Sequence, residues 1–184
     1  MSYIGNPYEG FEITKVTKKD LPVFSTVMHN SEHLNSQLLA SINILQARQP
    51  ESHDSNVKCT WRSDWFIHNE REFGFFVQLV KESALFICQY HLLNPNMRLN
   101  CINMWAMKYE DGDYAELHDH FPATLSGIYY VDVEDDCSPL VIEDTEIKPE
   151  NGLMVFFPSM ASHKVEPTTG KRTLISFNLM GAAM

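Results

Sequence analysis

The first part of the chain carries apolar positions at the spacing of an α-helix. Over 30–47 an apolar residue recurs every three or four positions, and Asn30 and Ser31 stand before the stripe as candidate N-caps. The stripe consists of Leu34, Leu38, Ile42 and Leu45. This pattern predicts an amphipathic helix whose apolar face packs on another layer of the protein.

A second helical stripe, richer in aromatic residues, covers 69–93. Asn69 and Glu72 have the spacing of a capping box at its start, and Asn94 with Pro95 ends the pattern. Its apolar positions are Phe73, Phe76, Val77, Val80 and Ile87. We expect both helices to pack on a sheet and the aromatic stripe to lie in the core.

From residue 99 onward the pattern changes to short apolar runs separated by turn residues. Val, Ile, Tyr and Phe dominate the runs, and Gly, Asp, Pro and Asn separate them, which is typical of a β barrel or sandwich. The expected strands are 99–109, 114–120, 125–133, 139–143, 153–157, 162–166 and 173–180. The expected turns are 111–113, 149–152 and 168–171. We therefore predict a mainly β protein with N-terminal helices.

Length and composition narrow the class of protein. The 184 residues fit a single domain over 1–184, with a helical and strand part at 1–98 and the β core at 99–184. A net charge of −10 without clustered Lys and Arg argues against nucleic acid as a partner. The N-terminus lacks the pattern of a secretory signal, and no apolar run approaches the length of a membrane helix. We therefore expect a cytoplasmic protein that does not enter a membrane.

The cysteines are widely spaced and form no CxxC pair, which is typical of reduced thiols rather than of a disulfide framework or a zinc site. They are Cys59, Cys88, Cys101 and Cys137.

Two histidines stand one residue apart in the predicted β core. Because residues i and i+2 of a strand point to the same face, His118 and His120 project together. Two neighbouring imidazoles suit a first-row transition metal, and the third ligand expected from another strand is His163. The other five histidines lie in the helical part of the chain. The pattern therefore predicts a metal site with three histidine ligands.

Two nearby carboxylates are alternative ligands. Glu116 shares the expected strand face of His118, so a set of Glu116, His118 and His163 would leave His120 in a supporting position. Asp119 would reach the metal only if a bulge turned its side chain inward. Both alternatives stay open on the sequence alone.

A cation opens the strand that follows the third histidine. Arg172 comes nine residues after His163 and begins an apolar run. A guanidinium that points into the barrel needs an anionic partner, because a buried unpaired charge is costly. Its planar fork pairs with a carboxylate through two hydrogen bonds. The pattern therefore predicts a carboxylate-bearing ligand beside the metal.

These motifs resemble the 2-oxoglutarate/Fe(II)-dependent oxygenases, and among them a small prolyl-hydroxylase-like branch of marine bacteria and their phages. The resemblance covers about 105–180 and rests on the segments WAMKYEDGDYAELHDH, LSGIYYV, GLMVFFPSMASHKVEP and RTLISFN. It implies a double-stranded β-helix (jelly roll) with packing helices. It also implies Fe(II) as cofactor, with 2-oxoglutarate and O2 as cosubstrates, and the cytoplasm of a phage-infected host as one setting.

The resemblance assigns roles to the candidate residues. His118, His120 and His163 would hold Fe(II), and Arg172 would anchor the far carboxylate of 2-oxoglutarate. Most of the superfamily has Asp or Glu where this chain has His120, so a neutral ligand would remove one negative charge from the site. Relatives often carry a small hydroxyl residue at the position of Leu174, which helps to hold the same carboxylate.

Further residues of the cosubstrate pocket follow from strand alternation. Ser176 shares the face of Arg172 and offers a hydroxyl to the ligand. The adjacent Tyr129 and Tyr130 face opposite ways, so only one of them points inward. We predict that Tyr129 is the one that binds a ligand carboxylate.

The expected function is that of a dioxygenase that hydroxylates an unidentified substrate, either peptidyl proline or a small molecule, with a homodimer as an expected assembly. One alternative is a three-histidine cupin-type dioxygenase, because Gly112, His118 and His120 have the spacing of the opening of the cupin motif. The expected Glu of that motif is missing, since positions 124 and 125 are Thr and Leu. A second alternative is a non-catalytic β-helix binding module.

Overall fold

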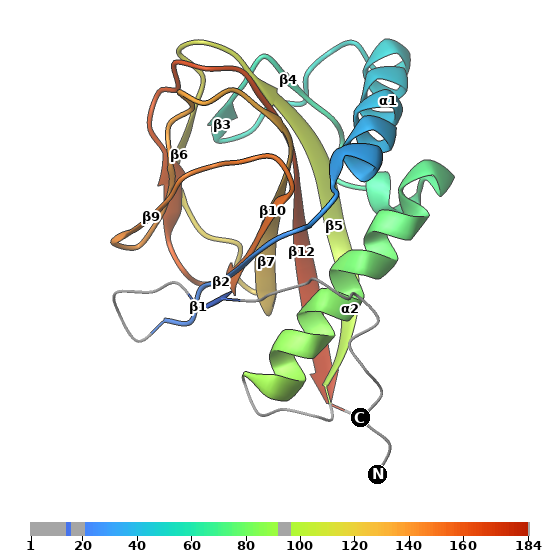
Figure 1. The fold of residues 1–184 in the computed structure, drawn as a ribbon, viewed down its shortest axis with the longest axis vertical. Helices are drawn as coiled ribbons and strands as arrows, with labels where there is room; N and C mark the ends of the chain where they lie inside the picture. Colours follow the sequence, from blue (N-terminus) through green and yellow to red (C-terminus); the bar gives the residue numbers. More distant parts are fainter. Residues whose placement is uncertain (1–13, 16–20, 92–96, 184) are drawn as a thin grey trace.

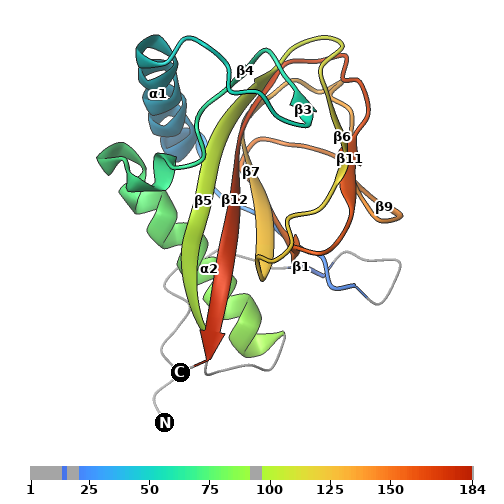
Figure 2. The ribbon, with the colours of Figure 1, turned by 180° about the vertical axis from the view of Figure 1, so that it is seen from behind.

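Two helices cover one face of a large sheet, and a smaller sheet lies on its other side (Figures 1 and 2). The computed structural model describes residues 14–15, 21–91 and 97–183. The helical elements are α1 (Glu32–Arg48), α2 (Gly74–Tyr90) and the 3-10 turns η1 (Ile67–Asn69) and η2 (Arg71–Phe73). Within the described residues, neither helix is both long and apolar enough to cross a lipid bilayer.

The first helix begins and ends within two residues of its prediction, and its N-cap is Ser31. The second begins later than predicted, because the chain forms η1 and η2 before it. The N-cap of α2 is Phe73, and no side chain caps this helix end, so the predicted capping box of Asn69 and Glu72 is wrong. The predicted stop at 94–95 lies outside the described residues.

The strands follow the predicted pattern in the second half of the chain. Each of the seven expected strands is present, with bounds shifted by up to three residues. They are β5 (Met97–Tyr109), β6 (Tyr114–His118), β7 (Leu125–Val133), β8 (Leu140–Ile142), β10 (Leu153–Pro158), β11 (His163–Val165) and β12 (Arg172–Ala183). The additional strand β9 (Thr145–Ile147) is not among the expected strands and pairs with β8.

Short strands from the first part of the chain complete both sheets. They are β1 (Thr14–Lys15), β2 (Phe24–Val27), β3 (Val57–Lys58) and β4 (Trp61–Arg62). The large sheet has the order β1-β2-β10-β7-β12-β5-β4, and the small sheet has the order β3-β6-β11-β8-β9. Every named pair is antiparallel. This architecture confirms the predicted jelly roll with packing helices.

The large sheet separates two apolar cores. Residues of β12 alternate between them: Ile175 and Phe177 pack against the helices, whereas Leu174 packs between the two sheets. Both faces of the sheet are therefore buried, and the strand residues do not alternate between apolar and polar as they would beside water. The candidate site lies between the sheets.

Candidate metal centre

Three histidines from the small sheet meet at one end of the space between the sheets. His118 ends β6, His120 follows it, and His163 begins β11 directly opposite His118 in the antiparallel pair. One ligand atom from each ring lies within 4.8 Å of the others. The ring centroids are 4.2 Å apart for His118 and His163, and 4.9 Å apart for each pair with His120. This spacing allows all three imidazoles to bind a single ion.

The backbone orients two of the rings. Nδ1 of His118 lies 2.6 Å from the carbonyl oxygen of Glu116, and Nδ1 of His163 lies 3.0 Å from that of Ala161. A carbonyl accepts only from a protonated nitrogen, so each bond places the proton on Nδ1 and leaves Nε2 unprotonated. The backbone N–H of His120 donates to the carbonyl of Ser159 at 2.7 Å, which ties the third ligand to the loop before β11.

The site keeps its imidazoles neutral. Burial lowers the pKa of all three rings, and the neighbouring imidazoles lower those of His120 and His163 further. The pKa falls to about 3 for His120 and to about 4 for His163. Metal ligation requires the unprotonated ring, so the three donors are ready to bind at neutral pH. Neutral nitrogen donors of this number suit Fe(II) and other first-row divalent ions.

No carboxylate joins the group within the part of the chain that the structure describes. The register of β6 shifts between its pairs, since His118 lies opposite His163 but Ala115 lies opposite Val165. The bulged strand therefore holds one extra residue, and simple alternation fails there. Glu116 is exposed, so the expectation that it shares the face of His118 is wrong.

Asp119 also lies outside the histidine group. Its side chain is exposed, and its carboxylate accepts a hydrogen bond from the backbone N–H of Phe121 at 3.0 Å. The bulge in β6 comes before His118 and does not turn Asp119 inward. Both carboxylate alternatives are thus contradicted by the fold.

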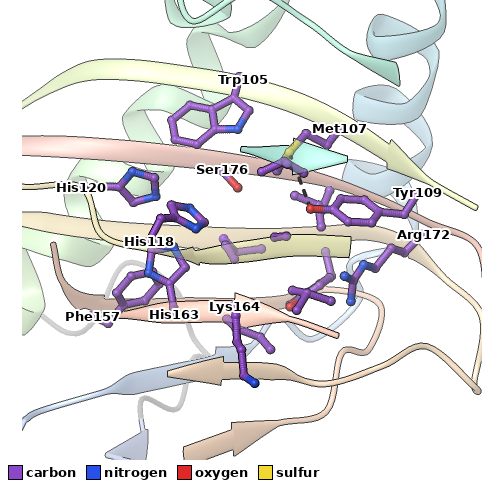
Figure 3. Close-up of a pocket in the computed structure, with 18 residues that line it drawn as sticks. Trp105, Met107, Tyr109, His118, His120, Phe157, His163, Lys164, Arg172 and Ser176 are labelled. Atoms are coloured by element: carbon purple, nitrogen blue, oxygen red, sulfur yellow. Dashed lines mark hydrogen bonds between the residues drawn. The ribbon is translucent and has the colours of Figure 1, made fainter. Parts of the chain in front are cut away.

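At the other end of the same pocket lies a buried guanidinium. Arg172 is only 2% exposed, and its guanidinium lies 4.4 Å from the ring centroid of Tyr109 (Figure 3). Nη1 donates to the carbonyl of Ser138 at 2.8 Å, whereas Nε and Nη2 have no hydrogen-bond partner. Two free N–H groups on one buried cation fit a carboxylate that enters the pocket.

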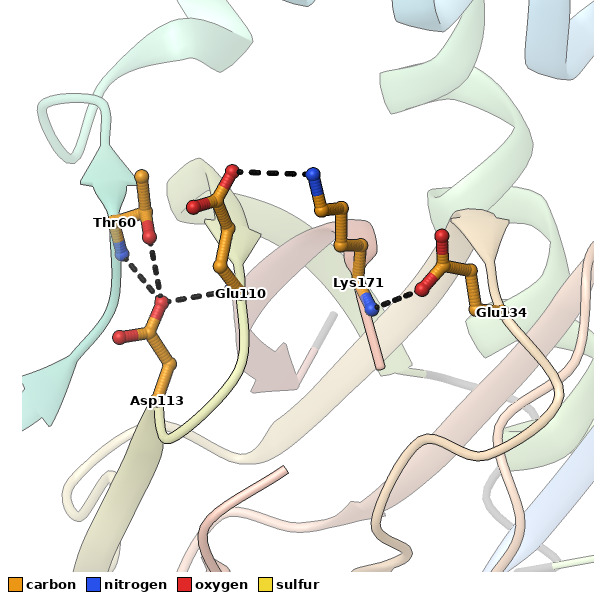
Figure 4. A network of polar contacts seen from close by, with 5 residues as sticks. All are labelled: Thr60, Glu110, Asp113, Glu134 and Lys171. Atoms are coloured by element: carbon orange, nitrogen blue, oxygen red, sulfur yellow. Dashed lines mark hydrogen bonds and ion pairs between the residues drawn. The ribbon is translucent and has the colours of Figure 1, made fainter. Parts of the chain in front are cut away.

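Surface contacts hold the start of β12 (Figure 4). The backbone N–H of Lys171 donates to the carboxylate of Glu134 at 2.8 Å, and its ammonium pairs with Glu110 at 3.7 Å. The carboxylate of Asp113 accepts hydrogen bonds from the backbone N–H of Glu110 and from both the N–H and the hydroxyl of Thr60. These contacts join the β5–β6 turn to the strand that carries Arg172.

The pocket between the two ends has mostly apolar walls. Ser176 and Leu174 line it, which places Ser176 on the face of Arg172, while Trp105 and Met107 line it from β5. Its full lining is Val57, Trp105, Met107, Tyr109, Ala115, His118, His120, Gly127, Ile128, Tyr130, Leu140, Phe157, His163, Lys164, Val165, Arg172, Leu174 and Ser176.

The inward tyrosine is Tyr130, and the prediction of Tyr129 is wrong. Tyr129 points to the helices, where its hydroxyl donates to Asn35 at 2.6 Å and its ring packs on Phe76. Tyr130 lines the pocket. Both tyrosines are buried, because one face of the sheet meets the helices and the other meets the small sheet. Apolar patterning therefore does not distinguish the two faces.

Sequence reasoning missed the pocket residues of β5. Trp105, Met107 and Tyr109 line the pocket at alternate positions of one strand. The signal that finds them is the period of two along the segment WAMKY, once the strand is known to lie beside the strand of Arg172.

Comparisons with known proteins agree with this arrangement. A family model described as putative 2OG-Fe(II) oxygenase matches residues 103–148, which include His118 and His120. No curated protein matches the chain. The family match supports the resemblance to the 2-oxoglutarate/Fe(II) oxygenases, and the solved structures described next share the fold.

Three solved structures are similar to this fold. The viral collagen prolyl hydroxylase of Paramecium Bursaria Chlorella virus-1, in complex with 2OG, is 17% identical and superposes with a TM-score of 0.58 over 81% of this chain and 91% of its own. A Pseudomonas putida prolyl-4-hydroxylase is 14% identical, with a TM-score of 0.62 over 86% and 92%. HygX from Streptomyces hygroscopicus, with nickel, 2-oxoglutarate and hygromycin B bound, is 10% identical, with a TM-score of 0.60 over 87% and 82%.

Proposed function

We propose that this protein is an Fe(II)- and 2-oxoglutarate-dependent dioxygenase that hydroxylates an organic substrate. The observation that carries the proposal is a single pocket with a metal-ligand set at one end and an anion-binding cation at the other. The ligand set is His118, His120 and His163, and the cation is Arg172 with two unpaired N–H groups. A dicarboxylate that binds metal at one end needs such a pair of anchors.

Each residue has a distinct role in this proposal. The three imidazoles hold Fe(II), and the guanidinium of Arg172 binds the far carboxylate of 2-oxoglutarate. The hydroxyls of Ser176 and Tyr130 line the space between them and orient the cosubstrate. Leu174 adds an apolar wall where relatives often have a hydroxyl residue. When bound, the metal supplies the activation of O2, so that substrate, 2-oxoglutarate and O2 become hydroxylated substrate, succinate and CO2.

The apolar walls serve the same reaction by excluding water. Phe157, Ile128 and Leu140 surround the space between the anchors. Charged groups interact more strongly where water is absent, so the carboxylate of the cosubstrate is held more firmly by Arg172. A dry pocket also limits side reactions of the oxidising centre.

The similar structures indicate only broad classes of substrate. The similar structures include a collagen prolyl hydroxylase and a protein with hygromycin B bound, so the fold accepts both peptides and small molecules. We propose a peptide or small-molecule substrate, a cytoplasmic location, no nucleic-acid or membrane partner and assembly as a homodimer. The net charge of −10 supports the exclusion of nucleic acid.

The test is anaerobic titration of the metal-free protein with Fe(II) and then with 2-oxoglutarate. We expect a weak visible absorption band that appears only when both are present, because the keto acid must contact the metal. A cupin-type dioxygenase would bind Fe(II) without the band, and a binding module would bind neither. Either of these two results would refute the proposed function.

A further inference from the structure

A second buried arginine lies beside the pocket. Arg62 in β4 is 0% exposed, and none of its three guanidinium nitrogens has a hydrogen-bond partner. It forms no ion pair within 14–15, 21–91 and 97–183. Arg172 at least donates to a backbone carbonyl, so Arg62 is the more completely unpaired of the two.

Strand pairing places this side chain on the pocket side of the large sheet. Arg62 lies opposite Met107 in the β4–β5 pair, and Met107 lines the pocket. Opposed residues of neighbouring strands project to the same face. The preceding Trp61 packs on the helix side instead, where its indole donates to the carbonyl of Gln49.

Two indole rings surround the guanidinium. Its central carbon lies 3.6 Å from the ring centroid of Trp65 and 5.6 Å from that of Trp105. Stacking on aromatic faces stabilises a cation without using its N–H groups. Trp65 is partly exposed, whereas Trp105 is buried.

Trp105 adds a further unpaired donor and connects the cation to the metal centre. Its indole N–H is buried and has no hydrogen-bond partner. Its ring packs edge-on against His120, with centroids 5.6 Å apart, and lies next to the histidines in Figure 3. The guanidinium and the indole therefore both present buried donors without acceptors beside the pocket.

An acceptor with negative charge satisfies both groups. A carboxylate has two oxygens and accepts several charge-assisted hydrogen bonds, so a single carboxylate can accept from both donors. Burial lowers the pKa of Arg62 to about 10, so the group still carries its charge at neutral pH. A buried cation without a counter-ion is costly, which is the signature of a site kept for a ligand.

We propose that Arg62 and the indole N–H of Trp105 bind the carboxylate of the substrate, which is therefore a small organic acid with a free carboxylate rather than an internal peptide residue. This inference rests on the proposed function, because Trp105 lines the same pocket as the three histidines. Trp65 stacks against the guanidinium. The apolar walls contributed by Met107 and Trp105 then contact the uncharged part of the substrate.

The test uses metal-free protein without 2-oxoglutarate, so that it does not depend on turnover. Cyclohexanecarboxylate and the neutral cyclohexanecarboxamide are titrated while tryptophan fluorescence is recorded, since two of the three indoles border the site. We expect a saturable change with the acid and none with the amide. An equal response to both compounds would overturn the proposal.

Two variants locate the acid. Arg62→Met should weaken its binding by about tenfold or more, because charge-assisted hydrogen bonds are lost, whereas Arg172→Gln should leave the fluorescence response in place. Loss of the response in Arg172→Gln alone would mean that the acid binds only at the cosubstrate anchor, and the proposal would fail.

A stability measurement separates this role from a structural one. Replacing an unpaired buried charge by an apolar chain of similar length should keep or raise the melting temperature of Arg62→Met. A clear fall in melting temperature would assign Arg62 to holding the fold. If that variant does not fold, Trp105→Phe removes the indole N–H together with part of the ring and should still weaken binding of the acid; unchanged binding in Trp105→Phe would then refute the proposal.

The two proposals fail in different ways. Arg62→Met should retain the visible band of Fe(II) and 2-oxoglutarate, since it lies at neither anchor. A protein that binds the acid through Arg62 but shows no band would refute the dioxygenase function alone. A protein that shows the band but does not distinguish acid from amide would refute the substrate class alone.

Discussion

His163 lies directly opposite His118 in the β6–β11 pair, with ring centroids 4.2 Å apart. Two residues 45 positions apart in the sequence thus become cross-strand neighbours on one face of the small sheet. Cross-strand pairing holds the two rings at a fixed distance, so the ion-binding geometry depends on the register of this pair.

Removal of this ligand should abolish tight metal binding. His163→Ala leaves two imidazoles. Loss of a hydrogen bond that supports a metal ligand lowers metal affinity by about 10–100-fold, and loss of the ligand itself should lower the affinity of the protein for Fe(II) by more. Isothermal titration with Fe(II) under anaerobic conditions measures the change. His53→Ala, an exposed histidine far from the group, is the matched control and should bind as the wild type does.

The same titration tests whether the carboxylate of Glu116 binds the metal. Glu116→Gln should leave the affinity for Fe(II) unchanged, because Glu116 is exposed on the outside of the bulge. A loss comparable to that of His163→Ala would restore Glu116 as a ligand and contradict the three-histidine centre.

Loss of the second anchor should affect the cosubstrate and not the metal. Arg172→Gln removes the charge that faces the pocket, and the concentration of 2-oxoglutarate needed for half-maximal visible absorption should rise by about tenfold or more. Fe(II) binding should stay within about twofold of the wild type. Lys171→Gln changes the neighbouring exposed cation and serves as control.

If Arg172→Gln lost Fe(II) binding as well as 2-oxoglutarate binding, the guanidinium and the three histidines would not act as separate anchors. Such a result would indicate that the guanidinium supports the fold of the metal centre itself.

The adjacent tyrosines should respond differently to loss of their hydroxyls. Tyr130→Phe should raise the half-saturating 2-oxoglutarate concentration without much change in stability, because this hydroxyl borders the pocket. Tyr129→Phe should lower the free energy of unfolding by about 0.5–1.5 kcal/mol, since it removes the hydrogen bond to Asn35, and should leave cosubstrate binding unchanged. Urea unfolding measures the change in stability, and the visible titration measures cosubstrate binding. Weaker cosubstrate binding in Tyr129→Phe, with lower stability in Tyr130→Phe, would contradict the assignment of Tyr130 to the pocket.

A glycine at the floor of the pocket should not tolerate a methyl group. A Cβ on Gly127 would lie 2.4 Å from the ring of Phe177 and 2.5 Å from the carbonyl oxygen of Val155. Gly127→Ala should therefore lose about 1–3 kcal/mol of stability in urea unfolding. Gly74→Ala, at the start of α2 with open space around its Cα, should instead gain about 0.4–1 kcal/mol. Equal stability of the two variants would contradict the packing of β7 against β10 and β12.

Acid should destabilise the metal-free protein through the buried histidines. The pKa of His163 is about 4 in the folded protein, below its ordinary value of 6.5, so the unfolded chain binds more protons between these two values. The free energy of unfolding therefore falls as the pH is lowered from 6.5 towards 4, and this contribution is complete above 6.5. Urea midpoints measured across this range should fall more steeply for wild type than for His163→Gln.

The exposed His53 again provides the comparison. His53→Gln should follow the wild-type profile, because this exposed side chain is not part of the histidine group. A His163→Gln profile as steep as that of the wild type would assign the acid sensitivity to other groups.

Two helices, seven strands and the candidates for chemistry could be predicted from the sequence alone. Short apolar runs bounded by Gly, Asp and Pro placed the strands of the second half, since strand propensity and turn preferences are local properties. His118, His120, His163 and Arg172 were candidates from residue type and spacing, because few side chains ligate metals or bind carboxylates. The ranges 30–47 and 69–93 were helical for the same local reason, although propensity did not foresee the 3-10 turns before Gly74.

The tertiary structure alone decided which way the ambiguous side chains point. Tyr129 and Tyr130 differ by one position in a strand that is buried on both faces, so only the packing of helices on one side and strands on the other separates them. Glu116 does not share the face of His118, because a bulge adds one residue to β6. Arg62 became an unpaired buried cation because β4 pairs with β5 over the pocket. Such facing depends on contacts between distant segments, which local apolar patterning does not encode.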